Sequence, residues 1–143
     1  MDPPQAGLPV SLLEVVMSRE YQGPDRVLLC VDDSNGILEY ERALFERSGY
    51  IVVTTESARE GLKLVTMFNF DAVLLDYHMP EMNGHQLASE IRRIRPATPV
   101  VIFSGEKMIP EETRNLVDAV VLKDALRELF PTITRLCNRP SAA

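Results

Sequence analysis

The stretch RVLLCVDDSNGILEYERALFERSGYIVVTT, residues 26–55, carries the pattern that decides the fold. It opens with an apolar run, Val27–Val31, and closes with a β-branched run, Ile51–Thr55. Between them, apolar side chains recur three to four residues apart, at Ile37, Tyr40 and Leu44. This spacing predicts an amphipathic helix, which Gly49 is placed to end. Nearly continuous apolar runs are typical of parallel strands that helices cover on both faces, so the stretch predicts a β–α–β unit.

The same alternation continues toward the C-terminus. Three further apolar runs follow, Ala72–Leu75, Val100–Phe103 and Ala119–Leu122. Five strands that alternate with five helices predict an α/β fold, the flavodoxin-like (βα)5 doubly wound sandwich. We expect a parallel five-stranded sheet with the strand order 2-1-3-4-5, because crossover connections in such sheets are right-handed.

Residues at the helix ends support these boundaries. Ser57–Glu60 has the form of a capping box at the start of the second helix. The third helix has an apolar stripe, made of Leu87, Ala88, Ile91 and Ile94. Pro96 is expected to end that helix, and Pro110, followed by two glutamates, to open the fourth. Asp124 is predicted to cap the fifth helix, and Pro131 to kink or split it.

Composition excludes several classes of protein. The chain has 143 residues, which suits one domain, and a net charge of −6. This acidic balance argues against a general nucleic-acid binder, because phosphate backbones require clustered positive charge. Two cysteines, Cys30 and Cys137, do not make a disulfide framework and favour a reducing compartment. Since neither a basic signal region nor a membrane-length run of about 18 apolar residues is found, we expect a cytoplasmic protein without membrane insertion.

The chain divides into three segments. Residues 1–25, which contain four prolines, form an N-terminal leader that is either flexible or carries one short extra helix. The helix is suggested by apolar pairs four residues apart, Leu12 with Val16 and Leu13 with Met17. Residues 26–137 form the domain, and 138–143 a C-terminal tail.

Polar residues follow four of the five predicted strands. Asp32 and Asp33 end the first strand, Asp76 the third, Ser104 the fourth and Lys123 the fifth. Carboxyl ends of parallel strands meet at one edge of the sheet, where binding crevices form. Three converging carboxylates repel one another unless a cation lies among them, and oxygen ligands of this kind suit Mg²⁺. A lysine and a hydroxyl opposite them can hold phosphoryl oxygens, so the edge predicts phosphoryl transfer with a carboxylate nucleophile.

Four segments carry a resemblance to a known family. They read VLLCVDD at 27–33, LLDYHMPEMNG at 74–84, VIFS at 101–104 and VLK at 121–123. Together they resemble the receiver domains of two-component response regulators, over about residues 26–137. We expect no output domain after Lys123, so the chain resembles stand-alone receivers of the chemotaxis-regulator type.

The resemblance implies a role for each residue of the edge. Asp76 is similar to the phosphoacceptor, and Lys123 to the phosphate-binding lysine. Ser104 is similar to the switch hydroxyl. The implied Mg²⁺ ligands are Asp33, Asp76 and the backbone carbonyl of His78, with Asp32 ligating through water. We expect a chain that promotes only its own phosphorylation and dephosphorylation, receives the phosphoryl group from a histidine kinase or a phosphotransfer protein, and signals to a protein rather than to nucleic acid.

Three departures from the family concern signal output. Asp124 follows Lys123 where the family has a proline after a cis bond, and a cis bond before a non-proline residue costs about 2.5–4 kcal/mol, so we expect a trans peptide. Val120 stands where receivers commonly carry the tyrosine or phenylalanine that rotates on activation. The interval from Ser104 to Lys123 is shorter than is usual, which implies a short fourth helix.

Three other functions would use some of the same residues. A receiver that binds partners regardless of phosphorylation stays open, because the output features are altered. A dehalogenase-type phosphatase also uses an aspartate at a strand end, but it needs a second aspartate where His78 stands. A flavodoxin-type flavin site is disfavoured, because Asp32 and Asp33 would put negative charge where the flavin phosphate binds.

Overall fold

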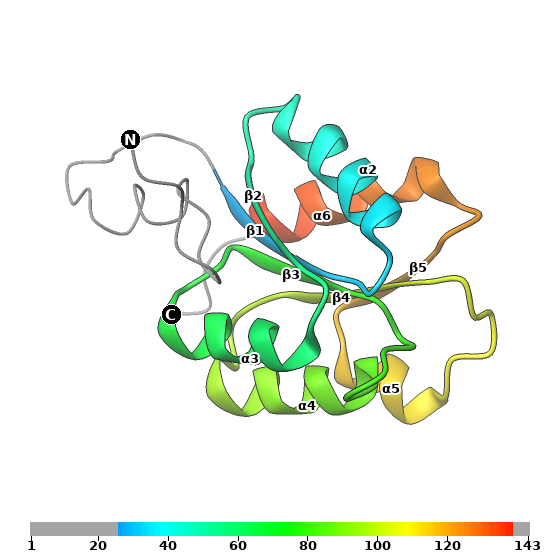
Figure 1. The fold of residues 1–143 in the computed structure, drawn as a ribbon. Helices are drawn as coiled ribbons and strands as arrows, with labels where there is room; N and C mark the ends of the chain where they lie inside the picture. The colour runs from blue at the N-terminus through cyan, green and yellow to red at the C-terminus, as the bar shows by residue number, and fades with distance from the viewer. Residues whose placement is uncertain (1–25, 139–143) are drawn as a thin grey trace.

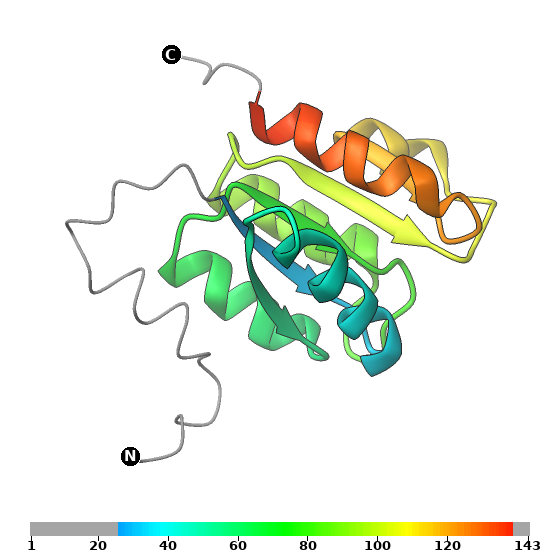
Figure 2. The same cartoon turned by 90° about the horizontal axis from the view of Figure 1, so that it is seen from above.

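The computed structural model describes residues 26–138 as one five-stranded parallel sheet with helices on both faces (Figures 1 and 2). The strand order is β2-β1-β3-β4-β5, which confirms the predicted flavodoxin-like topology. The strands are β1 (Val27–Val31), β2 (Ile51–Thr55), β3 (Ala72–Leu75), β4 (Val100–Ser104) and β5 (Ala119–Leu122). Their bounds match the five apolar runs, except that β4 extends one residue further, to Ser104.

Two helical layers cover the sheet. The helices are α2 (Asn35–Glu46), α3 (Ala58–Met67), α4 (Gly84–Ile94), α5 (Glu111–Leu116) and α6 (Leu129–Asn138), with a 3-10 turn η1 (Leu126–Glu128) before α6. Alternate side chains of each strand point to opposite faces. Thus Leu29 and Val31 of β1 pack with α3 and α4, whereas Leu28 and Cys30 pack with α2 and α6. All five residues of β1 are buried, as expected for a central parallel strand.

Side chains at the helix starts account for where α3 and α4 begin. Ser57 caps α3 by accepting a hydrogen bond from the Glu60 amide at 3.1 Å, which is one half of the predicted capping box. Asn83 and Gln86 form a complete capping box at the start of α4. Helix α4 ends at Ile94, before Pro96, as predicted.

The buried face of α2 differs from the predicted one. The prediction placed Ile37, Tyr40 and Leu44 against the sheet, but Tyr40 is 36% exposed and the other two are only partly buried. The deepest residues lie one position later, at Leu38, Glu41 and Phe45. Since each residue turns the helix by about 100°, a shift of one position rotates the buried face by that angle. Sequence reasoning missed this face because a glutamate occupies its centre.

The C-terminal part of the chain corrects two predicted helix starts. Pro110 is the N-cap of α5 rather than its first residue, and the six-residue α5 is as short as expected. Asp124 does not cap a helix: it lies in a turn in which the Ala125 amide donates to the Leu122 carbonyl. The last helix is divided into η1 and α6, with Pro131 in the first turn of α6, where its missing N–H costs no helical hydrogen bond. The peptide between Lys123 and Asp124 is trans, as predicted.

The predicted leader, 1–25, and most of the predicted tail, 138–143, lie outside the described residues. Asn138 belongs to α6 rather than to a tail. Within 26–138, no helix has the length and apolar character that crossing a membrane requires.

Candidate functional site

The ends of β1, β3, β4 and β5 bring the predicted site residues to one edge of the sheet. Backbone hydrogen bonds hold these ends in register. The Asp76 amide donates to the Val31 carbonyl at 2.9 Å, and the Lys123 amide donates to the Ser104 carbonyl at 2.8 Å. Each side chain is thus positioned by the end of a hydrogen-bonded strand, which is a rigid support for a reactive group.

Three carboxylates gather at the centre of this edge. Oxygen atoms of Asp32, Asp33 and Asp76 all lie within 4.8 Å of one another. Asp32 is 1% exposed and Asp76 7% exposed, whereas Asp33 is open to solvent. Carboxylates this close repel one another strongly unless positive charge lies between them.

Lys123 supplies part of that positive charge. Its ammonium Nζ lies 3.0 Å from Oδ2 of Asp32 and 3.2 Å from Oδ1 of Asp76. The contact with Asp32 is a close ion pair, and Oδ2 of Asp32 accepts no well-aligned hydrogen bond within residues 26–138. The Lys123 Nζ also lies over the Phe103 ring, 5.9 Å from the ring centroid. One lysine against three carboxylates leaves the cluster with excess negative charge.

The pKa values of Asp76 and Lys123 are both raised, but for different reasons. Burial, and then the charge of Asp32, raise the pKa of Asp76 above its ordinary value, although Lys123 opposes the shift. Burial alone would lower the pKa of Lys123, but its contacts with Asp32 and Asp76 outweigh this effect and raise that pKa. Lys123 therefore stays charged at neutral pH.

Local hydrogen bonds orient the two buried carboxylates. Oδ1 of Asp32 accepts from the Ser34 amide at 2.9 Å, and Oδ1 of Asp76 accepts from the Tyr77 amide at 3.0 Å. Oδ1 of Asp76 also accepts from Lys123 Nζ, so both of its lone pairs are engaged. The other oxygen, Oδ2, receives no hydrogen bond from residues 26–138. Asp76 thus has one oxygen held and one available for a phosphoryl group or a cation.

Ser104 and His78 lie at the site without touching its carboxylates. The Ser104 hydroxyl is buried and accepts a hydrogen bond from the Glu106 amide at 2.9 Å. The His78 side chain is exposed, and its Nε2 lies 3.5 Å from the Glu106 carboxylate. This contact joins the β3–α4 loop to the β4–α5 loop at the mouth of the site. No sequence pattern singled out Glu106, because its role depends on a contact between two loops.

Gly84 limits how the β3–α4 loop can be built. A Cβ atom at this position would lie 2.7 Å from the Asp76 carbonyl oxygen and 2.8 Å from the Tyr77 Cα, closer than real atoms approach. The Gly84 amide donates to the Tyr77 carbonyl at 2.7 Å. Only glycine lets the start of α4 come this close to the backbone of Asp76.

We expect Gly84→Ala to lower the free energy of unfolding by about 1–3 kcal/mol, since the added methyl group forces the backbone apart. The matched control is Gly36→Ala in the exposed first turn of α2, where the nearest atom to a new Cβ is 3.9 Å away. Alanine favours helix there, so this variant should be more stable by up to about 1 kcal/mol. Urea denaturation measures both changes, and equal effects at the two glycines would contradict the steric argument.

The fold and the site agree with comparisons to known proteins. The family model of the response regulator receiver domain matches residues 28–127. The chain belongs to this family. Receiver domains of two-component systems exchange signals with histidine kinases and downstream effectors, and their acidic pocket corresponds to the three-carboxylate cluster of this receiver.

Individual relatives match different shares of the chain. The transcriptional regulatory protein GlrR of Escherichia coli (strain K12) is 40% identical over 84 residues, which are 59% of this chain and 19% of GlrR. The cell cycle response regulator CtrA of Brucella ovis is 33% identical over 91 residues, 64% of this chain and 39% of CtrA. The matched segment therefore spans well under half the length of either relative.

A solved structure supports the same assignment. The response regulator TrrA of Thermotoga maritima, crystallised in complex with Mg²⁺ and BeF, is 27% identical and has a TM-score of 0.74. The match covers 78% of this chain and 98% of TrrA.

Proposed function

We propose that this receiver accepts a phosphoryl group on Asp76 from the phosphohistidine of a histidine kinase or of a phosphotransfer protein. The observation that carries the proposal is the placement of Lys123 Nζ at 3.0 and 3.2 Å from two of three clustered carboxylates. A phosphoryl group on Asp76 would meet a cation that is already positioned, which is how a preorganised site stabilises charge.

The transfer is a nucleophilic substitution at phosphorus. A carboxylate oxygen of Asp76 forms the new O–P bond while the P–N bond of the phosphohistidine breaks. The electron pair of that bond goes to the imidazole nitrogen, which takes a proton from solvent. Lys123 stays protonated throughout and attracts the phosphoryl oxygens. Ser104, buried at the adjacent strand end, is the hydroxyl that can turn toward a phosphoryl oxygen.

The carboxylate cluster also fits a divalent cation. Mg²⁺ prefers oxygen ligands and keeps several waters, and this site offers carboxylate oxygens from Asp32, Asp33 and Asp76 close together. We assign Asp33, Asp76 and the backbone carbonyl of His78 as direct ligands and Asp32 as a ligand through water. When bound, Mg²⁺ would neutralise charge on the carboxylates and the phosphoryl oxygens.

We infer that the receiver acts as a switch rather than as an enzyme with a separate substrate. It would promote only its own phosphorylation and dephosphorylation and pass the signal on by protein–protein contact. The free thiols of Cys30 and Cys137 support a cytoplasmic location, where such thiols stay reduced. The identity of the downstream protein does not follow from the site, since fold and chemistry are shared across the family.

Intact-mass measurement after incubation with acetyl phosphate or phosphoramidate tests this proposal. With Mg²⁺, we expect the mass of one added phosphoryl group. With a chelator in place of Mg²⁺, uptake should fall to background. Absence of uptake under both conditions would favour the alternative, a receiver that binds its partners regardless of phosphorylation.

Metal binding should stabilise the unphosphorylated receiver. A ligand that binds only the folded state at ten times its dissociation constant adds about 1.4 kcal/mol, so the melting temperature should rise with Mg²⁺ concentration. Asp33→Ala should remove this response and leave the metal-free stability equal or slightly higher, because one repelling carboxylate is gone. Glu39→Ala, an exposed acidic change on α2, is the matched control and should keep the response. A normal metal response in Asp33→Ala would refute the ligand assignment.

Activation should change the conformation of the loops beside the site more than that of residues 108–130, which include α5, β5 and η1. Val120 is partly buried and has no ring to swing, and α5 has only six residues to carry a displacement. We expect beryllofluoride, a phosphoryl mimic, to alter amide exchange mainly at residues 77–85 and 104–107. Changes at 108–130 should be smaller. Large changes confined to 108–130 would show that the signal leaves by another route.

A further inference from the structure

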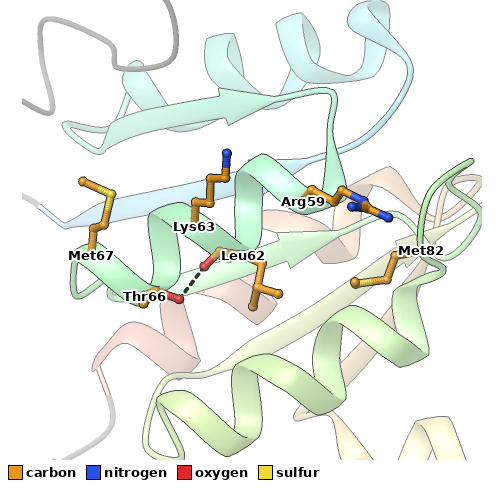
Figure 3. Close-up of a pocket in the computed structure, with 6 residues that line it drawn as sticks. All are labelled: Arg59, Leu62, Lys63, Thr66, Met67 and Met82. Carbon is orange, nitrogen blue, oxygen red and sulfur yellow. Dashed lines mark hydrogen bonds between the residues drawn. The ribbon is translucent and has the colours of Figure 1, made fainter.

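A groove runs along α3, and Figure 3 shows the side chains that line it. Its volume is about 640 Å³, and its lining is Arg59, Leu62, Lys63, Thr66, Met67 and Met82. Five of these residues follow one another at helical spacing on α3, and Met82 comes from the β3–α4 loop. We call this surface the α3 groove.

The α3 groove combines an apolar floor with a basic rim. Leu62, Met67 and Met82 supply apolar surface, and Met67 is 59% exposed, which is unusual for so large an apolar side chain. The Thr66 hydroxyl donates to the Leu62 carbonyl at 2.8 Å, so it does not need a hydrogen bond from a ligand. Lys63 has no carboxylate partner within residues 26–138. This positive rim lies on a protein whose net charge is −6.

Contacts at the end near Met82 fix the shape of the α3 groove. The Ser57 hydroxyl donates to the Glu81 carboxylate at 2.8 Å, and the Arg59 guanidinium lies 3.5 Å from the same carboxylate. These contacts tie the start of α3 to the loop that carries Met82. A surface that is held in this way loses little freedom when a ligand binds, which favours affinity.

The chain itself contains a segment of complementary chemistry. Residues 8–21 read LPVSLLEVVMSREY, in which apolar side chains recur at helical spacing beside Glu14 and Glu20. The apolar positions match the floor of the α3 groove. Arg19 is the one basic residue of the segment, so Glu14 and Glu20 leave it a net charge of −1, which matches Lys63 on the rim of the groove.

The segment also joins the domain close to the C-terminal end of α3, within reach of the α3 groove. The Val27 amide donates to the Asp71 carboxylate at 2.7 Å, and the Arg26 guanidinium lies 3.9 Å from it. Asp71 follows Met67, the last residue of α3, by only four positions. The chain therefore enters the domain beside the segment that leaves the C-terminal end of α3. From residue 21 to residue 26, an extended connector reaches up to about 17 Å.

We propose that residues 8–21 bind the α3 groove of the same molecule, with their apolar side chains on Leu62, Met67 and Met82 and their carboxylates toward Lys63. A short connector gives the segment a millimolar effective concentration, so a dissociation constant below about 1 mM is enough to keep the groove mostly occupied. The contact requires no phosphorylation and is tested on the unmodified receiver.

A tryptophan reporter in the full chain tests this proposal. The chain contains no tryptophan, so Met17→Trp introduces a unique fluorophore. We expect a blue-shifted emission and an acrylamide quenching constant severalfold below that of free indole. Adding Met67→Glu, which puts a charge on the floor of the groove, should restore the emission and quenching of an exposed indole. The matched control is Met108→Glu, because Met108 is also exposed but lies in the β4–α5 loop and does not line the α3 groove.

Each outcome decides the proposal. Protection that is lost with Met67→Glu, kept with Met108→Glu and independent of protein concentration supports it. Protection that grows with protein concentration assigns the groove to a second copy of the chain and overturns the intramolecular contact. Protection that survives Met67→Glu places the segment elsewhere. An exposed indole in the Met17→Trp protein itself, confirmed with Val16→Trp, rules the contact out.

Discussion

Replacing Asp76 by asparagine is expected to abolish phosphoryl uptake from acetyl phosphate. Asparagine keeps the volume and the buried position at the end of β3, but its amide is a far weaker nucleophile than a carboxylate. It also removes the charge that holds Lys123 Nζ at 3.2 Å. Because Asp32 still lies 3.0 Å from Nζ, the lysine stays paired and the site keeps its shape. The expected loss is therefore chemical rather than structural.

Intact mass after incubation with acetyl phosphate and Mg²⁺ measures this loss directly. The variant should show no added phosphoryl group at times when the parent protein is fully modified, and its melting curve should show a folded protein. Asp124→Asn is the control, since Asp124 is exposed and lies next to Lys123 in the chain without belonging to the carboxylate cluster. One phosphoryl group on the Asp76→Asn protein would mean that another residue is the acceptor.

The sequence predicted the site well because strand ends are easy to locate. Each buried strand is a continuous apolar run, so the first polar residue after it marks the carboxyl edge of the sheet. In this way Asp32, Asp76 and Lys123 could be placed together before any contact was known, and their carboxylate and ammonium groups are indeed within 3.2 Å. The strand order followed from the number of β–α units and the right-handed crossover.

The faces of the helices were harder to predict. Helix α2 contains two adjacent apolar pairs, Ile37–Leu38 and Leu44–Phe45, so either of two faces could meet the sheet. Hydropathy favoured the face with Tyr40 over the face with Glu41, whereas packing selected the latter. Local propensity could not reveal this, because tertiary contacts decide which stripe is buried.

The sequence also failed to predict the contact between the two loops and the start of the last helix, because both depend on tertiary structure. The approach of His78 to Glu106 depends on how two loops fold over the mouth of the site. Asp124 has the right side chain for an N-cap, but the turn that follows β5 delays the helix, and its carboxylate lies 3.5 Å from Lys107 instead. In both cases the type of residue could be read from the sequence, but the residue that it contacts could not.

Glu41 is an acidic residue that is buried in the core beneath α2. Its side chain is 2% exposed in the layer between the sheet and α2, and its Oε1 has no hydrogen-bond partner within residues 26–138. Burial, followed by the charge of Asp32, raises the pKa of Glu41 well above its usual value. Burial, followed by the charge of Glu41, also raises the pKa of the Cys30 thiol. An unsatisfied buried polar group of this kind costs about 1–3 kcal/mol.

We therefore expect Glu41→Leu to raise the free energy of unfolding by about 1–3 kcal/mol at neutral pH, and the gain to grow with pH. The folded protein keeps the Glu41 proton above the pKa of the unfolded chain, which is about 4.3. Between that pH and the raised folded pKa, the folded state binds more protons than the unfolded state, so this group lowers stability as pH rises, by up to about 1.4 kcal/mol per pH unit. Both Glu41→Leu and Glu41→Gln remove this dependence, whereas Glu39→Gln, on the exposed face of the same helix, should leave it intact. Urea denaturation from pH 5 to pH 8 measures the effect, and parallel pH profiles for the parent and both Glu41 variants would mean that Glu41 is charged or hydrated in the folded core.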